Sequence, residues 1–162
     1  MLLYVMRHGP AEDRAPTGRD FDRVLTAAGR EVVARSARAL HAGRRSLGGR
    51  LRLLSSPLRR ARETAEIVAS ILVPPLAVEL HDDLAADAGL PRDLVADVAA
   101  AGADALLVGH QPIVEQLVGE LLHPAHPSLP GGFPTALIVA LERVVPDRWR
   151  RAAVFDPYRA DP

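Results

Sequence analysis

An Arg-His-Gly triplet follows the first apolar run of the chain, which covers residues 2–6. A guanidinium offers two parallel donors that match phosphate oxygens, and it stays charged at any working pH. The imidazole beside it has the chemistry of a nucleophile or a general base. Arg7 and His8 therefore predict a site for a phosphoryl group, and Gly9 would allow close approach between backbone and ligand.

Two further apolar runs lead into residues of the same kinds. Residues 105–108 precede Gly109 and His110, and residues 51–54 precede a Ser-Ser-Pro triplet with Arg60 just beyond it. Arg60 is a second candidate for phosphate binding, and His110 is a candidate for a second proton-handling or charge-stabilising group. A lone histidine is more often a capping or surface residue, but arginine and histidine at several convergent strand ends make chance assembly improbable.

Alternating strand and helix patterns must position these residues. Continuous apolar runs are typical of strands covered on both faces. The predicted strands are Leu2–Met6, Leu51–Leu54, Ala77–Leu80, Ala105–Val108 and Ala136–Leu141, with a less regular pattern around Arg151–Phe155. Apolar stripes of helical period cover Thr26 to about Leu40, Leu58–Leu72, about Pro91–Ala100 and Pro112–Leu122. This alternation predicts a three-layer α/β/α fold with a mainly parallel central sheet.

Two of the polar junctions are predicted to open helices. Pro57 and Pro112 suit the first turn of a helix, and Ser55 or Ser56 can cap the first of these helices. Unpaired N–H groups at helix N-termini favour a bound anion. The helices would therefore support phosphate binding at the same edge of the sheet.

Composition limits the classes of protein. The 162 residues fit one domain, residues 1–162, with zero formal net charge, no cysteine, and arginine as every basic residue besides histidine. The lack of cysteine excludes disulfides, thiolate zinc sites and phosphatases with a cysteine nucleophile, and the lack of lysine excludes a P-loop or Schiff-base lysine. Mixed charge without a basic stripe disfavours nucleic-acid binding. The absence of a long apolar stretch predicts no membrane association and a cytoplasmic location.

Two histidine-bearing segments are predicted to lie outside the site. His81 and Asp82 follow a predicted strand rather than sharing a helix face, and further ligands at compatible positions are lacking, so this pair is predicted to be surface. His123 and His126 flank prolines and are predicted to be exposed. We expect no metal site.

The ordered set of motifs resembles the histidine phosphatase superfamily, also called phosphoglycerate mutase-like. Three segments of this chain carry the resemblance: Arg7-His8-Gly9, Ser55-Ser56-Pro57-Leu58-x-Arg60-Ala61-x-x-Thr64 and Val108-Gly109-His110-Gln111-Pro112. The short chain and Asp22-Arg23-x-Leu25-Thr26-x-x-Gly29-Arg30 are similar to its SixA-like phosphohistidine phosphatase branch. The resemblance runs from residue 2 to about residue 122.

The resemblance implies a role for each matching residue. His8 would attack phosphorus and carry the phosphoryl group, while Arg7, Arg60 and a protonated His110 would hold its oxygens, with Gly9 also at the phosphate. No metal and no other cofactor would be needed, because these cations supply the positive field.

The general acid is the part of the pattern that the sequence does not match. Larger members of the superfamily use a carboxylate after the third strand, where residues 80–89 offer no glutamate equivalent. Asp87 is the candidate, with Asp82 and Asp83 next, and Glu12 is another. Phosphohistidine has a nitrogen leaving group that needs little protonation by a carboxylate. The lack of the family's glutamate therefore fits phosphohistidine better than an alkyl phosphate as the substrate.

The sequence therefore predicts a metal-independent phosphatase that uses a phosphohistidine intermediate on His8 and acts on a histidine-phosphorylated protein. Hydrolysis of small phosphate esters or nucleotides on the same fold is the enzymatic alternative. The short chain and the missing acid argue against a mutase. A non-catalytic module that binds phosphoryl groups is the alternative from another class, and it ranks lower because all four site residues are retained.

Overall fold

A computed structural model of the chain describes residues 1–43, 51–72, 76–122, 132–146 and 148–159. His123 and His126, predicted to be exposed, lie outside the described residues. No helix within these described ranges is both long and apolar enough to cross a membrane.

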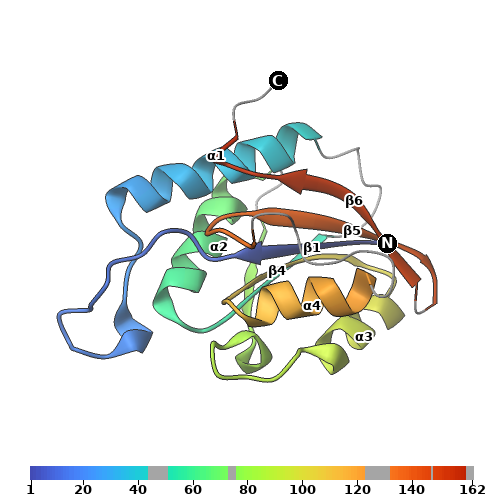
Figure 1. The fold of residues 1–162 in the computed structure, drawn as a ribbon, viewed down its shortest axis with the longest axis horizontal. Helices are drawn as coiled ribbons and strands as arrows, with labels where there is room; N and C mark the ends of the chain where they lie inside the picture. Colours follow the sequence, from blue (N-terminus) through green and yellow to red (C-terminus); the bar gives the residue numbers. More distant parts are fainter. Residues whose placement is uncertain (44–50, 73–75, 123–131, 147, 160–162) are drawn as a thin grey trace.

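Six strands form one mixed sheet in the order β3-β2-β4-β1-β5-β6 (Figure 1). Their bounds are β1 (Leu2–Arg7), β2 (Leu51–Ser55), β3 (Val78–Leu80), β4 (Asp104–Gly109), β5 (Ile138–Val145) and β6 (Arg148–Phe155). The neighbours β3, β2, β4 and β1 pair in parallel, whereas β5 is antiparallel to both β1 and β6. The predicted strands and the mainly parallel sheet are confirmed; β5 and β6 form a hairpin because their connection is too short for a crossover.

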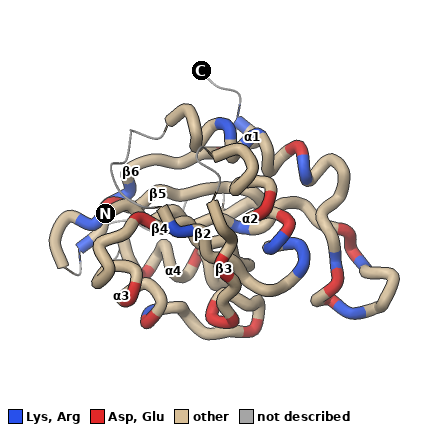
Figure 2. The backbone as a smooth tube through the Cα atoms, turned by 180° about the vertical axis from the view of Figure 1, so that it is seen from behind, with Lys and Arg blue, Asp and Glu red and all other residues tan. Residues whose placement is uncertain are grey.

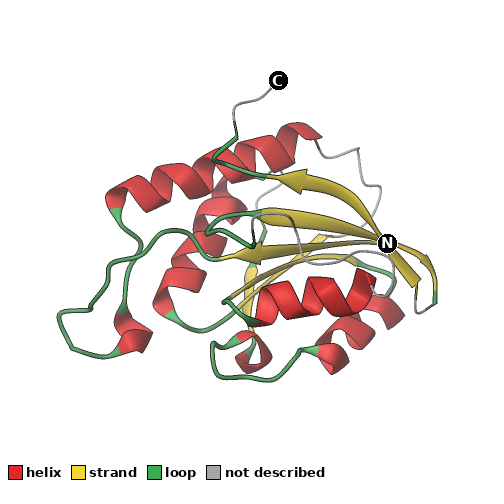
Figure 3. Ribbon diagram, in the orientation of Figure 1, coloured by secondary structure: helices red, strands yellow, loops and turns green. Residues whose placement is uncertain are grey.

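Helices cover both faces of this sheet (Figure 3). Their bounds are α1 (Ala27–Gly43), α2 (Arg59–Ile71), α3 (Arg92–Ala100) and α4 (Ile113–Leu122). All four were predicted from periodicity, and the structure shifts their ends by a few residues. Two short 3₁₀ turns, η1 (Asp20–Asp22) and η2 (Asp82–Leu84), were not predicted, because three residues carry no detectable period.

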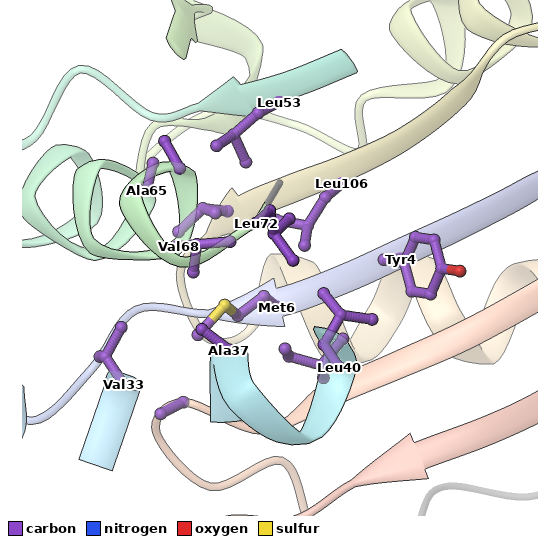
Figure 4. Packing of buried hydrophobic residues seen from close by; sticks show 14 of the residues in the cluster. Tyr4, Met6, Val33, Ala37, Leu40, Leu53, Ala65, Val68, Leu72 and Leu106 are labelled. Atoms are coloured by element: carbon purple, nitrogen blue, oxygen red, sulfur yellow. The ribbon is translucent and has the colours of Figure 1, made fainter. Parts of the chain in front are cut away.

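Each face of the sheet has its own hydrophobic core. Side chains alternate along β1, so that Tyr4 and Met6 point to one face while Leu3 and Val5 point to the other. Figure 4 shows the first core, in which Met6 and the strand leucines pack against α1 and α2. The second core packs against α3 and α4. Burial on both faces explains why the strands are continuously apolar, and it confirms the three-layer α/β/α architecture.

The helix starts differ in detail from the prediction. The N-cap of α2 is Leu58 and makes no side-chain cap hydrogen bond, so neither serine caps this helix. Instead, the Ser56 hydroxyl accepts the N–H of Leu58, while the Ser55 hydroxyl donates to the Ser56 carbonyl. Pro112 directly precedes α4. These junctions therefore turn the chain at the strand ends before each helix begins.

Candidate active site

Strand register places the polar residues at one edge of the sheet. Arg7 of β1 pairs with Gly109 of β4. The ladder continues beyond the strand ends, because the His8 N–H donates to the Gly109 carbonyl and the Ser56 N–H to the Val108 carbonyl, both at 3.0 Å. The tips of β1, β2 and β4 therefore meet, as predicted from three separate apolar runs.

The side chains of His8 and His110 face each other at this edge. Their ring centroids are 4.9 Å apart and the planes are tilted by 51°. Both residues are buried, with 9% of His8 and 2% of His110 exposed. Two imidazoles from different strand ends thus share one small site.

A hydrogen bond fixes the tautomer of His8. Nδ1 lies 2.7 Å from the carbonyl oxygen of Gly9, and a carbonyl can only accept, so Nδ1 carries the proton. In the neutral ring this leaves Nε2 with a free lone pair. The pKa of His8 is lowered to about 4, chiefly because the ring is buried; the Gly9 contact opposes this shift, and the charges of Arg60, Arg7 and Arg23 add to it. His8 is therefore neutral and nucleophilic at physiological pH.

Arg7 and Arg60 bring two guanidinium groups to the histidines. Nη1 of Arg7 donates to the Phe133 carbonyl at 2.9 Å, and Nη1 of Arg60 donates to the Asp20 carbonyl at 3.0 Å. Arg60 is only 5% exposed. Burial lowers the pKa of both guanidinium groups, and in Arg60 the Asp20 carboxylate opposes that shift.

Three buried nitrogen atoms of the site lack a hydrogen-bond partner. Within the described residues, the unpaired buried side-chain atoms are Nε of Arg7, Nε of Arg60, Nδ1 of His110 and Oε1 of Gln111. An unsatisfied buried donor costs about 1–3 kcal/mol, and such groups are rare in folded proteins. An oxyanion would supply acceptor atoms for the two guanidinium N–H groups, and for Nδ1 of His110 when that nitrogen is protonated. This arrangement is what binding of a phosphoryl group requires.

His110 is held by Ser56, which sequence analysis assigned only to a helix cap. Nε2 of His110 lies 2.9 Å from the Ser56 hydroxyl, and both side chains are buried. Burial, His8 and Arg60 lower the pKa of His110 to about 3. His110 is thus neutral in the ligand-free site, because burial and the neighbouring cations disfavour a further positive charge, and the protonated state that the resemblance implies stays a prediction for the phosphate-bound site. A bound dianion would raise this pKa.

An ion pair that the sequence did not predict lies over the site. Asp20, in η1, contacts Nη2 of Arg60 at 3.1 Å and Nη1 of Arg23 at 2.8 Å. The hydrogen bond from Arg23 is the main cause that lowers the pKa of Asp20, with Arg60 adding to it. Arg23 also donates to the Glu12 carbonyl at 2.6 Å. Asp20 and Arg23 were missed because their loop has no apolar period that could orient them.

Gly9 is engaged in packing in this structure. Its N–H donates to the Thr64 hydroxyl at 3.0 Å, and a Cβ at this position would lie 2.3 Å from Cγ2 of Val33. The Thr64 hydroxyl in turn donates to the Arg60 carbonyl at 2.7 Å. The glycine thus permits close approach of α1 to the strand end, and its role at the phosphate stays a prediction.

Glu63 is a buried carboxylate that fastens the loop before α1 onto α2. Oε2 accepts the Leu25 N–H at 3.0 Å and pairs with Arg30 at 2.8 Å, while Oε1 pairs with Arg59 at 3.1 Å. Arg59 is therefore directed away from Arg60, as one step of helical rotation predicts. Position 63, unassigned in the motif, therefore joins the loop before α1 to the helix that carries Arg60.

The predicted general acids do not join the cluster. Asp87, Asp82, Asp83 and Glu12 are exposed, and in the part of the chain that the structure describes their carboxylates make no hydrogen bond or ion pair with the site residues. His81 follows β3 and is partly exposed. Among the described residues, no group of three or more His, Asp or Glu side chains is placed to hold a metal ion.

Comparison with known proteins identifies relatives of this chain. A model of the histidine phosphatase superfamily (branch 1) matches residues 3–90. An uncharacterized protein of Picosynechococcus is 39% identical over 115 residues, which are 69% of this chain and 67% of that protein.

Solved structures match over nearly the full length. The protein histidine phosphatase SixA, complexed with tungstate, is 26% identical with a TM-score of 0.83, and the match covers 97% of both chains. A SixA structure from Agrobacterium tumefaciens is 30% identical with a TM-score of 0.73, covering 94% of this chain and 96% of that one.

Proposed function

Because the chain belongs to the histidine phosphatase superfamily, branch 1, and is a phosphatase with SixA-like structure, we propose that it hydrolyses phosphohistidine in a phosphorylated protein. The phosphoryl group passes through a covalent intermediate on Nε2 of His8. The observation that carries this mechanism is the hydrogen bond from His8 Nδ1 to the Gly9 carbonyl, which leaves Nε2 unprotonated beside two arginines.

In the first step the Nε2 lone pair of His8 attacks phosphorus. The bond between phosphorus and the leaving nitrogen breaks, and the bonding electron pair goes to that nitrogen. The substrate imidazole carries a proton from solvent on its other ring nitrogen and therefore departs as a neutral ring. In the second step water attacks phosphorus, the bond to Nε2 breaks, and phosphate leaves with neutral His8 restored. Because Nδ1 keeps its proton, which is donated to the Gly9 carbonyl, the same tautomer is ready for the next cycle.

Arg7, Arg60 and His110 stabilise the transferring group. Their unpaired nitrogens are buried, so hydrogen bonds formed there act at low dielectric and need no rearrangement of water. His110 takes up a proton when the dianion arrives, since a nearby negative charge raises the pKa of an imidazole. Ser56 keeps the ring of His110 in place during this change.

The acid–base properties of the site favour a nitrogen leaving group. Asp20 is the carboxylate that touches the described cluster, and two arginines hold its pKa below the ordinary value, which makes it a poor proton donor. An alkoxide leaving group needs a proton, whereas an imidazole does not require one from a carboxylate. This difference supports phosphohistidine over alkyl phosphates as the substrate.

A substrate panel in excess chelator tests the proposal. We expect kcat/KM for a phosphohistidine peptide to exceed that for the matching phosphoserine peptide by at least about a hundredfold, equivalent to about 3 kcal/mol in the barrier. Activity should persist in chelator, because the cationic side chains supply the positive field. Faster hydrolysis of phosphoserine or nucleotides, or activity that returns only with one divalent ion, would contradict the proposal.

A further inference from the structure

A second basic hollow lies between α1 and the C-terminal segment. It encloses about 510 Å³, and its lining includes Arg35, Arg38 and Arg159 together with Asp156 and Tyr158. Figure 2 shows blue segments and no red one on the second half of α1, the helix that contributes Arg35 and Arg38 to the lining. The arginines give the hollow a positive charge that the one aspartate does not balance.

The aspartate in this pocket has charged and polar partners, whereas two of the arginines have no anionic partner among the described residues. Both oxygens of Asp156 are engaged, Oδ1 by the Tyr158 N–H at 3.0 Å and Oδ2 by Nε of Arg159 at 3.3 Å. Arg35 donates only to the neutral Pro157 carbonyl, at 2.8 Å. Arg38 is exposed and makes no hydrogen bond or ion pair within the described residues. Two guanidinium groups are thus available to an anionic partner, because Asp156 is already paired.

Tyr158 links this pocket to the active site. The tyrosine lines the pocket. Its hydroxyl lies 2.8 Å from the Thr135 hydroxyl. The next residue, Ala136, donates its N–H to the carbonyls of Arg7 and His8. The pocket and the phosphate-binding residues therefore rest against the same short segment.

We propose that the pocket binds acidic side chains of the phosphorylated protein, close in sequence to the phosphohistidine. This inference rests on the proposed function. Tyr158 lines the pocket and contacts Thr135, next to the residue that bonds the Arg7 and His8 backbone. An extended polypeptide gains about 3.3 Å per residue, so the acidic residues that enter the pocket would lie several positions from the phosphohistidine. Carboxylates match the forked donors of Arg35 and Arg38.

Two peptides test this inference. Both carry one phosphohistidine; the first has Asp and Glu several positions before and after it, and the second has Asn and Gln at the same positions. At low ionic strength we expect the native enzyme to have a KM about fivefold lower for the acidic peptide, because exposed ion pairs contribute modestly. The preference should shrink below about twofold in about 0.5 M salt, because salt screens exposed charges.

Reversal of the charge at Arg38 tests whether the preference for the acidic peptide arises in this pocket. Arg38→Glu should lower the ratio of kcat/KM for the acidic peptide to kcat/KM for phosphoramidate by about tenfold, since attraction becomes repulsion. Arg148→Glu is the matched control, because Arg148 is exposed at the far end of the β5–β6 hairpin and its variant should keep the native ratio.

The possible outcomes distinguish a failure of the pocket inference from a failure of the proposed function. Equal KM values of the two peptides with native enzyme, or a preference that Arg38→Glu leaves intact, would overturn the pocket inference and leave the proposed function standing. If Arg38→Glu weakened inhibition by inorganic phosphate but left the peptide KM values unchanged, the pocket would bind a small anion and the inference would be wrong. Hydrolysis of an aryl phosphate but of neither phosphohistidine peptide would overturn both proposals.

Discussion

The carboxylate of Asp20 lies 3.1 Å from Nη2 of Arg60, a guanidinium that we propose holds the transferring phosphoryl group. An internal anion thus occupies donors that a phosphate would use. Because the Asp20 side chain is 58% exposed and η1 is a single short turn, the contact can yield to a dianion that binds more strongly.

Asp20→Asn should tighten the binding of phosphate. Removal of the charge ends competition for Arg60 and removes repulsion of the dianion, so we expect the inhibition constant of inorganic phosphate to fall by about threefold, a size typical of a screened surface charge. Asp22→Asn is the control, because this neighbour accepts the Thr17 hydroxyl instead. An unchanged or higher constant for Asp20→Asn would mean that the carboxylate orients Arg60 rather than competing for it.

Arg60→Lys should be damaging although it keeps the positive charge. A lysine loses the planar pair of donors, and the loss of one well-placed charged hydrogen bond costs on the order of 3 kcal/mol in the barrier, or roughly a hundredfold in kcat/KM. Arg59→Lys should be nearly silent, because Arg59 faces Glu63 and is half-exposed. Large and equal losses from both variants would contradict the roles assigned to these neighbours.

The buried histidines should make the fold less stable in acid. His8 and His110 have pKa values of about 4 and 3 in the folded chain, below the ordinary 6.5, so between about pH 6.5 and 4 the unfolded state binds more protons. As the pH is lowered through this range, the free energy of unfolding therefore decreases by about 1.4 kcal/mol per pH unit for each histidine. The decrease levels off below the folded pKa values.

Urea unfolding at pH 6 and pH 5 measures this effect. His110→Gln should reduce the pH dependence of the unfolding free energy by about 1 kcal/mol over this interval. His41→Gln, at an exposed position in α1, should keep the native dependence. A native dependence in His110→Gln would show that His110 is not buried as a neutral group.

Gly9→Ala should destabilise the fold through Val33. The added Cβ would meet Cγ2 of Val33 at 2.3 Å, and overpacking of this kind costs about 1–3 kcal/mol. In a double-mutant cycle with Val33→Ala, the coupling should recover about 1 kcal/mol or more of that loss. Purely additive effects, together with weaker phosphate inhibition in Gly9→Ala, would favour the phosphate-binding role that the sequence suggested.

The sequence predicted the elements that depend on long apolar patterns. Strands buried on both faces and helices with apolar stripes were recognisable, and their alternation required that Arg7, Ser56 and His110 meet at one edge. That residues 1–162 form a single domain stays a prediction, as do the catalytic roles of the four site residues.

The missed features depend on contacts between distant segments. Asp20 and Glu63 belong to no pattern that separates them from ordinary surface charges, and the motif that contains Arg23 assigns it no contact. Only the folded loop places Asp20 against Arg60 and Arg23. The neutral state of His110 was likewise missed, because burial and neighbouring cations determine it. The helix caps were mispredicted because Ser56 bonds to His110 and to the backbone ahead of α2.

Trapping of the intermediate tests the central claim most directly. Native enzyme mixed briefly with phosphohistidine substrate and quenched in alkali should carry one phosphoryl group, alkali-stable and acid-labile, that peptide mass spectrometry places on His8. His8→Ala should carry none and lose hydrolysis. A label on any other residue, or near-native turnover by His8→Ala, would contradict the mechanism.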